Sequence, residues 1–386
     1  MNRKQTDQMR DVVDKAKSIV RNTLVWDNHG CMPVGAPFGT DFLPELRRYR
    51  EAGVNVVSLN VGFGEMDVAD HFQTLATIRR WVSMHDDYML VSTSADVYLA
   101  EQTGRLGVCF DIEGANAIGD QLSLISAYHS LGVRWMLLAY NRNNLAGGGC
   151  QDDDDGLTAF GHDVVREMER VGMVVCCSHT GYRTARDVLK MATKPVVFSH
   201  SNAHAIVAHP RNIPDDLVRE CAQTGGVVGV NGIGLFLGPA DADQAELVAT
   251  HIDHMVQIVG PRHIGLGLDY VFDTGELKAY LAKMRATFPA EFGYDTDISM
   301  LPPERCSMLS HRCFDAGTQK VTSAPSSEAT FCGLPARSGD FGSSPASRIR
   351  LRTDGAHHAA RRSPNEAVTD DRAAAMSRSS NAGRAR

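Results

Sequence analysis

The 386-residue sequence contains no uninterrupted run of about 18 apolar residues, so it predicts no membrane-spanning helix. Residues 1–23 are charged and lack the apolar core of a secretory signal. Their apolar side chains fall instead at helical spacing. We therefore expect an N-terminal amphipathic helix at 1–23 and place the protein in the cytoplasm.

The sequence also lacks an excess of basic charge. Its formal net charge is −7, which argues against nucleic acid or an anionic membrane surface as a partner. Nine cysteines, an odd number at irregular spacing with no export signal, argue against a disulfide framework. A Gly-x-Ser-x-Gly elbow is absent, which argues against a serine hydrolase.

Between residues 24 and 270, short apolar β-rich runs alternate with amphipathic stretches, which predicts parallel strands joined by helical crossovers. The predicted strands are Leu24–Asn28, Val54–Val61, Leu106–Ile112, Val133–Tyr140, Met173–His179, Pro195–His200, Gly226–Val230 and His263–Asp269. Helices are predicted at Leu43–Ala52, Leu122–Leu131, Ala159–Val171 and Thr184–Met191. Eight such units favour a (β/α)8 TIM barrel over 24–305. An open doubly wound sheet fits the same periodicity.

The composition changes near residue 306. Residues 306–386 carry eleven Arg and one Lys against seven acidic residues, and few large apolar residues. Such a segment buries too little apolar surface to offset its ordering entropy, so it is predicted to be disordered. A second interpretation is a shift of the reading frame near Arg305, because a GC-rich gene read out of frame favours Arg over Lys. Resequencing the gene distinguishes the two.

Polar side chains with metal-binding chemistry stand at the ends of separate predicted strands. They are Asp27, His29, Glu113, His179, His200 and Asp269. In a (β/α)8 barrel the carboxyl ends of all strands meet at one rim, which is where active sites of this fold lie. One strand-end His is usually structural, but a set of this size in register predicts a site.

Three imidazoles and a carboxylate suit zinc or a similar divalent transition metal. A carboxylate such as Glu113 has two oxygens and is able to bridge two cations, and a metal-activated hydroxide then becomes available near neutral pH. Asp269 is then available to transfer protons. This set predicts hydrolysis of an amide or ester without a covalent intermediate.

Several short motifs make the pattern more specific. They are Asp27-Asn28-His29-Gly30-Cys31, Phe110-Asp111-Ile112-Glu113-Gly114, Ser178-His179-Thr180-Gly181, Phe198-Ser199-His200-Ser201-Asn202, Arg211-Asn212-Ile213-Pro214-Asp215-Asp216 and Gly265-Leu266-Gly267-Leu268-Asp269. Together they resemble the membrane (renal) dipeptidase family, peptidase family M19, whose members are metal-dependent, amidohydrolase-like barrels. The resemblance covers roughly residues 24–275.

The resemblance implies a zinc-dependent dipeptidase with two cations, one held by His29 and Glu113 and the other by Glu113, His179 and His200. Asp269 would carry a proton between the hydroxide and the leaving amine. Arg211 would bind the carboxylate of a small peptide substrate, since a planar guanidinium matches that group. Tyr140 stands where mammalian members have a substrate-facing His. The resemblance also implies a homodimer, for which we find no specific residue feature.

Two residues depart from the family pattern. Cys31 stands where the family has an aspartate ligand. A thiolate also binds zinc, so Cys31 either takes the place of that ligand or leaves a site with a single cation. Cys176 replaces an Asp expected to support His179.

Two other functions stay open at this point. One is hydrolysis of a different amide or a lactone by the same chemistry, and the other is a catalytically impaired relative. Cys31 and the altered sequence after residue 305 motivate the second.

Overall fold

The computed structural model describes residues 23–31, 39–64, 66–306, 308–309 and 330–331. Residues 1–342 form one compact unit and residues 343–386 a second, and the second lies outside the described residues. Almost all of the predicted helix at 1–23 and of the predicted disordered tail at 306–386 also lie outside them. The fold described below is therefore that of the barrel region.

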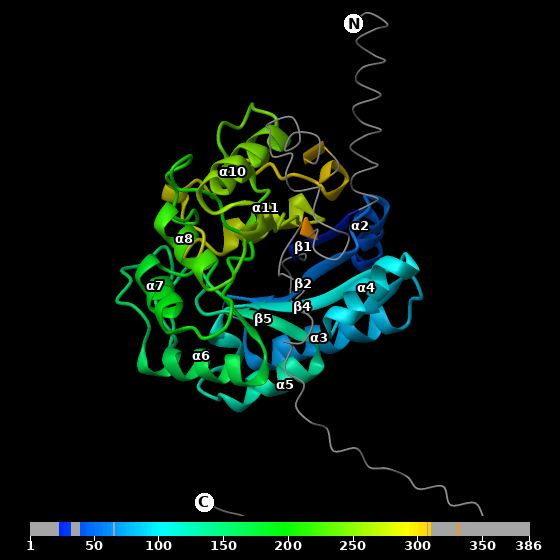
Figure 1. The fold of residues 1–386 in the computed structure, drawn as a ribbon, viewed down its shortest axis with the longest axis horizontal. Coiled ribbons are helices and arrows are strands. Elements are labelled where there is room, and N and C mark those ends of the chain that lie inside the picture. The colour runs from blue at the N-terminus through cyan, green and yellow to red at the C-terminus, as the bar shows by residue number, and fades with distance from the viewer. Residues whose placement is uncertain (1–22, 32–38, 65, 307, 310–329, 332–386) are drawn as a thin grey trace, which may run out of the picture. The chain divides into compact units, whose positions relative to one another are not determined.

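A parallel sheet occupies the centre of this unit (Figure 1). Seven of its strands follow each other in the order β6-β5-β4-β2-β1-β8-β7, while β3 pairs with β4 and β9 with β1. The strands are β1 (Leu24–Gly30), β2 (Val56–Phe63), β3 (Tyr88–Leu90), β4 (Leu106–Glu113), β5 (Val133–Leu137), β6 (Val174–Cys176), β7 (Val228–Val230), β8 (Ile264–Leu266) and β9 (Thr330–Phe331).

Residues 197 and 198 close the ring between its two ends. Val197 pairs in parallel with Cys176 of β6, and Phe198 pairs in parallel with Val228 of β7. The backbone N–H of Val197 donates to the carbonyl of Val175, and that of Phe198 donates to the carbonyl of Val227. The predicted strand at 195–200 is thus reduced to bridges, yet it still takes the eighth place. The strands therefore form a closed barrel, and the alternative prediction of an open doubly wound sheet is wrong.

The strands β2 and β4 are buried along their whole length, as their largely apolar sequences predict for strands covered on both faces. The sequence did not predict β3, which pairs with β4 alone through three residues. Such a short edge strand has no periodicity of its own to recognise. It lies beside the amino-terminal half of β4, away from the rim where the polar residues stand.

Helices surround the strands (Figure 1). They are α2 (Arg47–Glu51), α3 (Val68–Ser83), α4 (Ser94–Thr103), α5 (Ser123–Leu131), α6 (Ala159–Val171), α7 (Tyr182–Met191), α8 (Asp215–Gln223), α9 (Gly234–Leu237), α10 (Gln244–Val259) and α11 (Thr274–Lys283). Short 3-10 turns occur at η1 (Leu43–Leu46), η2 (Ala115–Ile118), η3 (Pro261–His263), η4 (Ala290–Phe292) and η5 (Pro303–Arg305).

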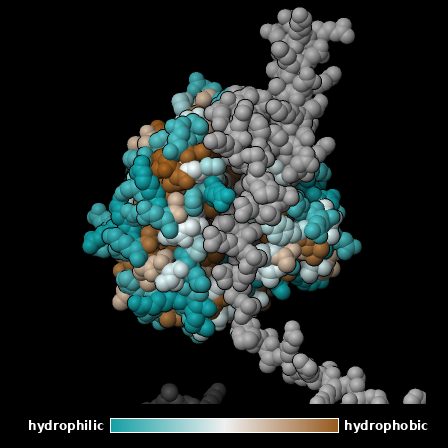
Figure 2. All heavy atoms as spheres, viewed as in Figure 1, coloured by the Kyte–Doolittle hydropathy of each residue, from teal (hydrophilic) through white to brown (hydrophobic). Residues whose placement is uncertain are grey.

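The helix α6 illustrates how the local sequence sets these bounds. The Thr158 hydroxyl caps its first turn by accepting from the N–H of Gly161, and Gly172 ends it with a φ of 87°. Its predicted and observed bounds coincide. The outer face of α7 is largely hydrophilic (Figure 2). None of the helices in the described part of the chain has the length and apolar character that a membrane crossing requires.

Asp154 fixes the acidic loop before α6 to the start of α7, the helix that follows His179. One carboxylate oxygen accepts from the N–H of Gly156 and the hydroxyl of Thr184, and the other accepts from the N–H groups of Arg183 and Thr184. Asp155, the next residue of this loop, is fully exposed.

We expect Asp154→Ala to lower the free energy of unfolding by about 1.5–3 kcal/mol, the usual contribution of hydrogen bonds to a charged group. Asp155→Ala is the matched control and should change it by no more than about 0.5 kcal/mol. Urea unfolding of both variants measures the difference. Equal stabilities would show that Asp154 does not anchor the loop.

Candidate metal centre

Four side chains that the sequence singled out converge at the carboxyl ends of the strands. His29 stands near the end of β1 and Glu113 ends β4. His179 follows β6, and His200 follows the bridging segment at 197–198. Each of the four is no more than 7% exposed, so the cluster is almost completely removed from water.

Glu113 is the centre of this cluster. Its Oε1 atom lies 3.5 Å from Nε2 of His29, 3.3 Å from Nε2 of His179 and 3.2 Å from Nε2 of His200. The Nε2 atoms of His179 and His200 are 2.8 Å apart. All three rings therefore present the same nitrogen to one carboxylate oxygen.

The other nitrogen of each ring has a separate partner. Nδ1 of His29 lies 3.3 Å from Asp111, Nδ1 of His179 lies 2.7 Å from the side-chain oxygen of Asn141, and Nδ1 of His200 lies 2.8 Å from the hydroxyl of Ser199. Donation from Nδ1 leaves the lone pair on Nε2, the tautomer that a metal ligand requires.

Two atoms at the centre have no hydrogen-bond partner, Nε2 of His29 and Oε1 of Glu113. A buried polar atom without a partner is costly unless an unseen group satisfies it. Two ligand atoms on one tetrahedral zinc lie about 3.4 Å apart. The 3.2–3.5 Å separations around Glu113 match that value, so the residues present fit a divalent cation.

The pKa shifts in the cluster also fit a bound divalent cation. Burial raises the pKa of Glu113 above its usual range, and burial lowers the pKa of His179 and His200 far below theirs. For His29, burial is outweighed by the carboxylates of Asp111 and Glu113, which raise its pKa well above normal. A divalent cation among these groups would favour the carboxylate and the neutral imidazoles.

Asp269 and Cys31 also lie close to His29. Oδ1 of Asp269 is 3.5 Å from Nε2 of His29, and its Oδ2 accepts from the side chain of Asn231 at 2.9 Å. The ligand atoms of His29, Cys31 and Asp269 all lie within 4.8 Å of one another. Burial raises the pKa of Asp269 above its usual range and that of the Cys31 thiol to about 12.

The backbone is strained at this rim. Among the described non-glycine residues, positive φ angles occur at Asn141 (59°), His179 (62°) and Asp269 (57°). Such angles are uncommon for residues with a side chain and tend to occur at functional sites. Gly114, with a φ of 122°, lets the chain turn away directly after Glu113.

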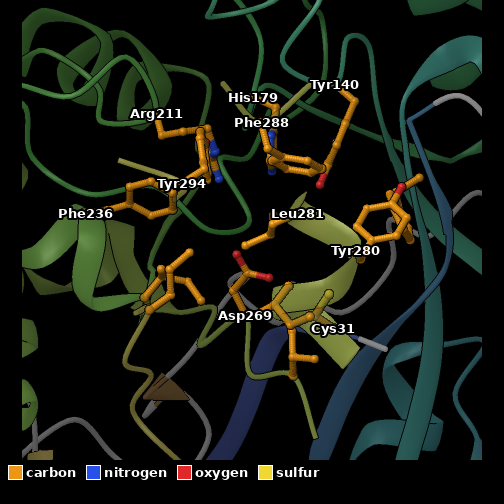
Figure 3. A pocket seen from close by; sticks show the side chains of 15 residues that line it. Cys31, Tyr140, His179, Arg211, Phe236, Asp269, Tyr280, Leu281, Phe288 and Tyr294 are labelled. Carbon is orange, nitrogen blue, oxygen red and sulfur yellow. The ribbon is translucent and has the colours of Figure 1, made fainter. Parts of the chain in front are cut away.

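A pocket of about 590 Å³, counting the open space at its mouth, lies beside the cluster. Figure 3 shows Asp269, Arg211 and Tyr280 around this pocket, with Arg211 and Tyr280 in different directions from Asp269. Arg211 is 2% exposed; its Nη2 donates to the carbonyl of His200, while its Nε and Nη1 have no partner. Tyr140 stacks on the ring of His179 at 4.3 Å between centroids.

The structure thus brings all the predicted site residues to one place, and it adds some that the sequence did not single out. Asn141 and Asn231 orient His179 and Asp269, and no motif marked either as a supporting residue. The wall of the pocket includes side chains from residues 271–298, where the sequence indicated no site at all.

Two residues play different parts from those expected. Cys176 was expected to influence His179, but its thiol contacts the hydroxyl of Ser199, which holds His200. Asp27 is buried and accepts from the backbone N–H groups of His29 and Leu268, so it joins β1 to the segment after β8.

A sequence model of membrane dipeptidase (peptidase family M19) matches residues 34–280, well over half of the chain. The chain belongs to the membrane dipeptidase family. Dipeptidase aclJ of Aspergillus oryzae is 34% identical over 245 residues, which cover 61% of this chain and 56% of that protein. The chain spans about half the length of the curated relatives it matches.

Solved structures share the fold of this membrane dipeptidase family member. An amidohydrolase from Pseudomonas aeruginosa matches with a TM-score of 0.70 and 24% identity, covering 81% of this chain and 93% of that one. A metallopeptidase from Rhodobacter sphaeroides, solved with a phosphinate mimic of the dipeptide L-Ala-D-Ala, matches with a TM-score of 0.57 and 22% identity, covering 75% and 99%. Both likenesses confirm the barrel fold.

Proposed function

We propose that this chain is a metal-dependent dipeptidase that hydrolyses small peptides with a free carboxyl terminus. The observation that carries the proposal is Arg211, a buried guanidinium with two unpartnered N–H groups, facing a pocket beside the His and Glu cluster. A carboxylate is the ligand that such a planar donor fork fits best. A neutral lactone or cyclic amide would leave those donors unsatisfied.

In this proposal two zinc ions would share Glu113 as a ligand. His29 and Glu113 would hold one, and Glu113, His179 and His200 the other. Imidazole and carboxylate ligands suit zinc, although other divalent transition metals bind the same set. When bound, such cations polarise a carbonyl oxygen and lower the pKa of water towards neutrality.

The remaining steps belong to the side chains of the chain itself. Arg211 holds the terminal carboxylate and so fixes the peptide bond near Asp269 (Figure 3). Asp269, oriented by Asn231, takes a proton from the attacking water and passes it to the leaving amine. The phenol of Tyr140, stacked on His179, donates to the developing oxyanion.

The relatives support the same substrate class. The similar protein from Aspergillus oryzae is a dipeptidase by name, and the Rhodobacter sphaeroides enzyme was solved with a dipeptide mimic. Neither relative identifies which side chains the substrate of this chain carries.

Cys31 completes the first cation site in this proposal. The sulfur of Cys31 lies within 4.8 Å of the ligand atoms of His29 and Asp269, and His29 lies 3.5 Å from Glu113. Cys31 would therefore be a third ligand beside His29 and Glu113. A thiolate is a good zinc ligand and favours softer metals than an aspartate does.

The zinc-loaded protein should cleave Ala-Ala and should cleave Ala-Ala amide at least about tenfold more slowly. Arg211→Met should lower kcat/KM for Ala-Ala by about 10- to 100-fold, because hydrogen bonds to charged groups contribute about 1.5–3 kcal/mol. Arg219→Met, on the exposed face of α8, is the matched control and should leave the rate unchanged. Turnover of neutral lactones or cyclic amides with inert dipeptides would contradict the proposal.

The role of Cys31 is testable by metal content and by the spectrum of the cobalt form. Wild-type protein should bind two zinc ions and show a sulfur-to-cobalt charge-transfer band after substitution with Co²⁺. Cys31→Ala should lose the band and about one zinc ion, whereas Cys31→Asp should lose the band and keep both ions. An unchanged zinc count of two in Cys31→Ala would exclude Cys31 as an essential ligand.

A further inference from the structure

Four aromatic rings form a closed circuit in the wall of the pocket. Phe63 lies 5.7 Å from Tyr140 and 5.6 Å from Tyr280, and Phe288 lies 6.1 Å from Tyr140 and 6.0 Å from Tyr280, all between ring centroids. The rings come from β2, from the segment after β5, from α11 and from the segment after α11. We call these four residues the ring cluster.

Tyr280 of the ring cluster and Arg211 lie in different directions from Asp269 (Figure 3). Phe236 and Tyr294 stand at the Arg211 end, and the guanidinium lies 5.4 Å above the ring of Phe236. Phe288 lies 5.2 Å from Tyr294, so rings run along the pocket, and the fixed positive charge of Arg211 distinguishes one part of it from the part at Tyr280, which we call the ring end. Asp269, the proposed proton carrier, lines the same pocket.

The ring end is apolar beyond the four rings. Leu277 and Leu281 of α11 complete it, and Asp269 is the single carboxylate among the described residues that line the pocket. A charged side chain entering this end would lose its water without gaining a charged partner. A large apolar side chain would instead bury its surface against rings.

The ring cluster is also well ordered for binding. Each ring has edge or tilted contacts with two others in the circuit, so its rotamer is already fixed before a ligand enters. Ordering of side chains is a main cost of binding, and a preformed wall avoids it. The stack of Tyr140 on His179 joins this wall directly to the metal centre.

We infer that the ring cluster binds a large apolar or aromatic side chain on the amino-terminal residue of the dipeptide. This inference rests on the proposed function, because the carboxylate at Arg211 sets the direction of the peptide. With the carboxyl-terminal residue at the Arg211 end and the cleaved bond at Asp269, the amino-terminal residue reaches the ring end.

The test compares kcat/KM for Phe-Ala, Ala-Ala, Glu-Ala and Ala-Phe with the zinc-loaded full chain. Phe-Ala should exceed Ala-Ala by about 10- to 100-fold, since even one methylene in an apolar pocket changes kcat/KM by about tenfold or more. Glu-Ala should be the slowest. Equal rates for Phe-Ala and Ala-Ala would overturn the inference, and a preference for Ala-Phe over Phe-Ala would overturn its direction.

Variants locate the effect in the ring cluster. Tyr280→Ala should reduce the Phe-Ala to Ala-Ala ratio by about tenfold, and Tyr280→Phe should restore it. Tyr98→Ala, an exposed tyrosine on α4, should leave the ratio unchanged. A ratio that Tyr280→Ala does not alter would contradict the assignment.

Binding separates this inference from the proposed function. Calorimetric titration of zinc-loaded Asp269→Asn with the same dipeptides measures affinity without turnover. Tighter binding of Phe-Ala than of Ala-Ala supports the ring cluster even if the wild-type protein cleaves neither, in which case the dipeptidase proposal alone fails. Equal affinities, or no binding, would overturn the inference.

Discussion

The site depends on one constraint, the burial of three imidazole nitrogens around a single carboxylate oxygen. Nε2 of His29, His179 and His200 all lie within 3.5 Å of Oε1 of Glu113, where water does not reach. With the ring protons on the Nδ1 atoms, hydrogen bonds among these groups leave the Nε2 lone pairs and the carboxylate oxygen without donors. A divalent cation resolves the conflict, so the metal and this part of the fold stabilise each other.

The constraint also explains where the backbone is strained. His179 and Asp269 have left-handed φ angles a few residues after the short strands β6 and β8, and Asn141, which holds His179, has one as well. Strain of this kind costs free energy and persists only where the surrounding structure enforces it. Here the rigid barrel beneath the rim supplies that support. The strain lowers the stability of the fold but keeps a geometry suited to metal binding.

The sequence predicted the barrel and the metal ligands because both leave periodic or positional signals. The runs 56–63 and 106–113 are largely apolar, and Glu113 at the end of the second marks the rim. The three-residue β3, the bridges at 197–198 and the support of His200 by Cys176 depend on contacts between distant segments, so no local pattern shows them. The same holds for the ring cluster, whose four rings are up to 225 positions apart in the chain.

The most direct test of the account is the thermal stability of metal-depleted protein with and without added zinc, together with the bound zinc measured on the same samples. Zinc should bind to the wild-type protein and raise its Tm by at least about 5 °C, since a ligand that binds only the folded state stabilises it. Glu113→Gln should bind less zinc and show little rise. A wild-type protein that retains no zinc and whose Tm does not change would contradict the account.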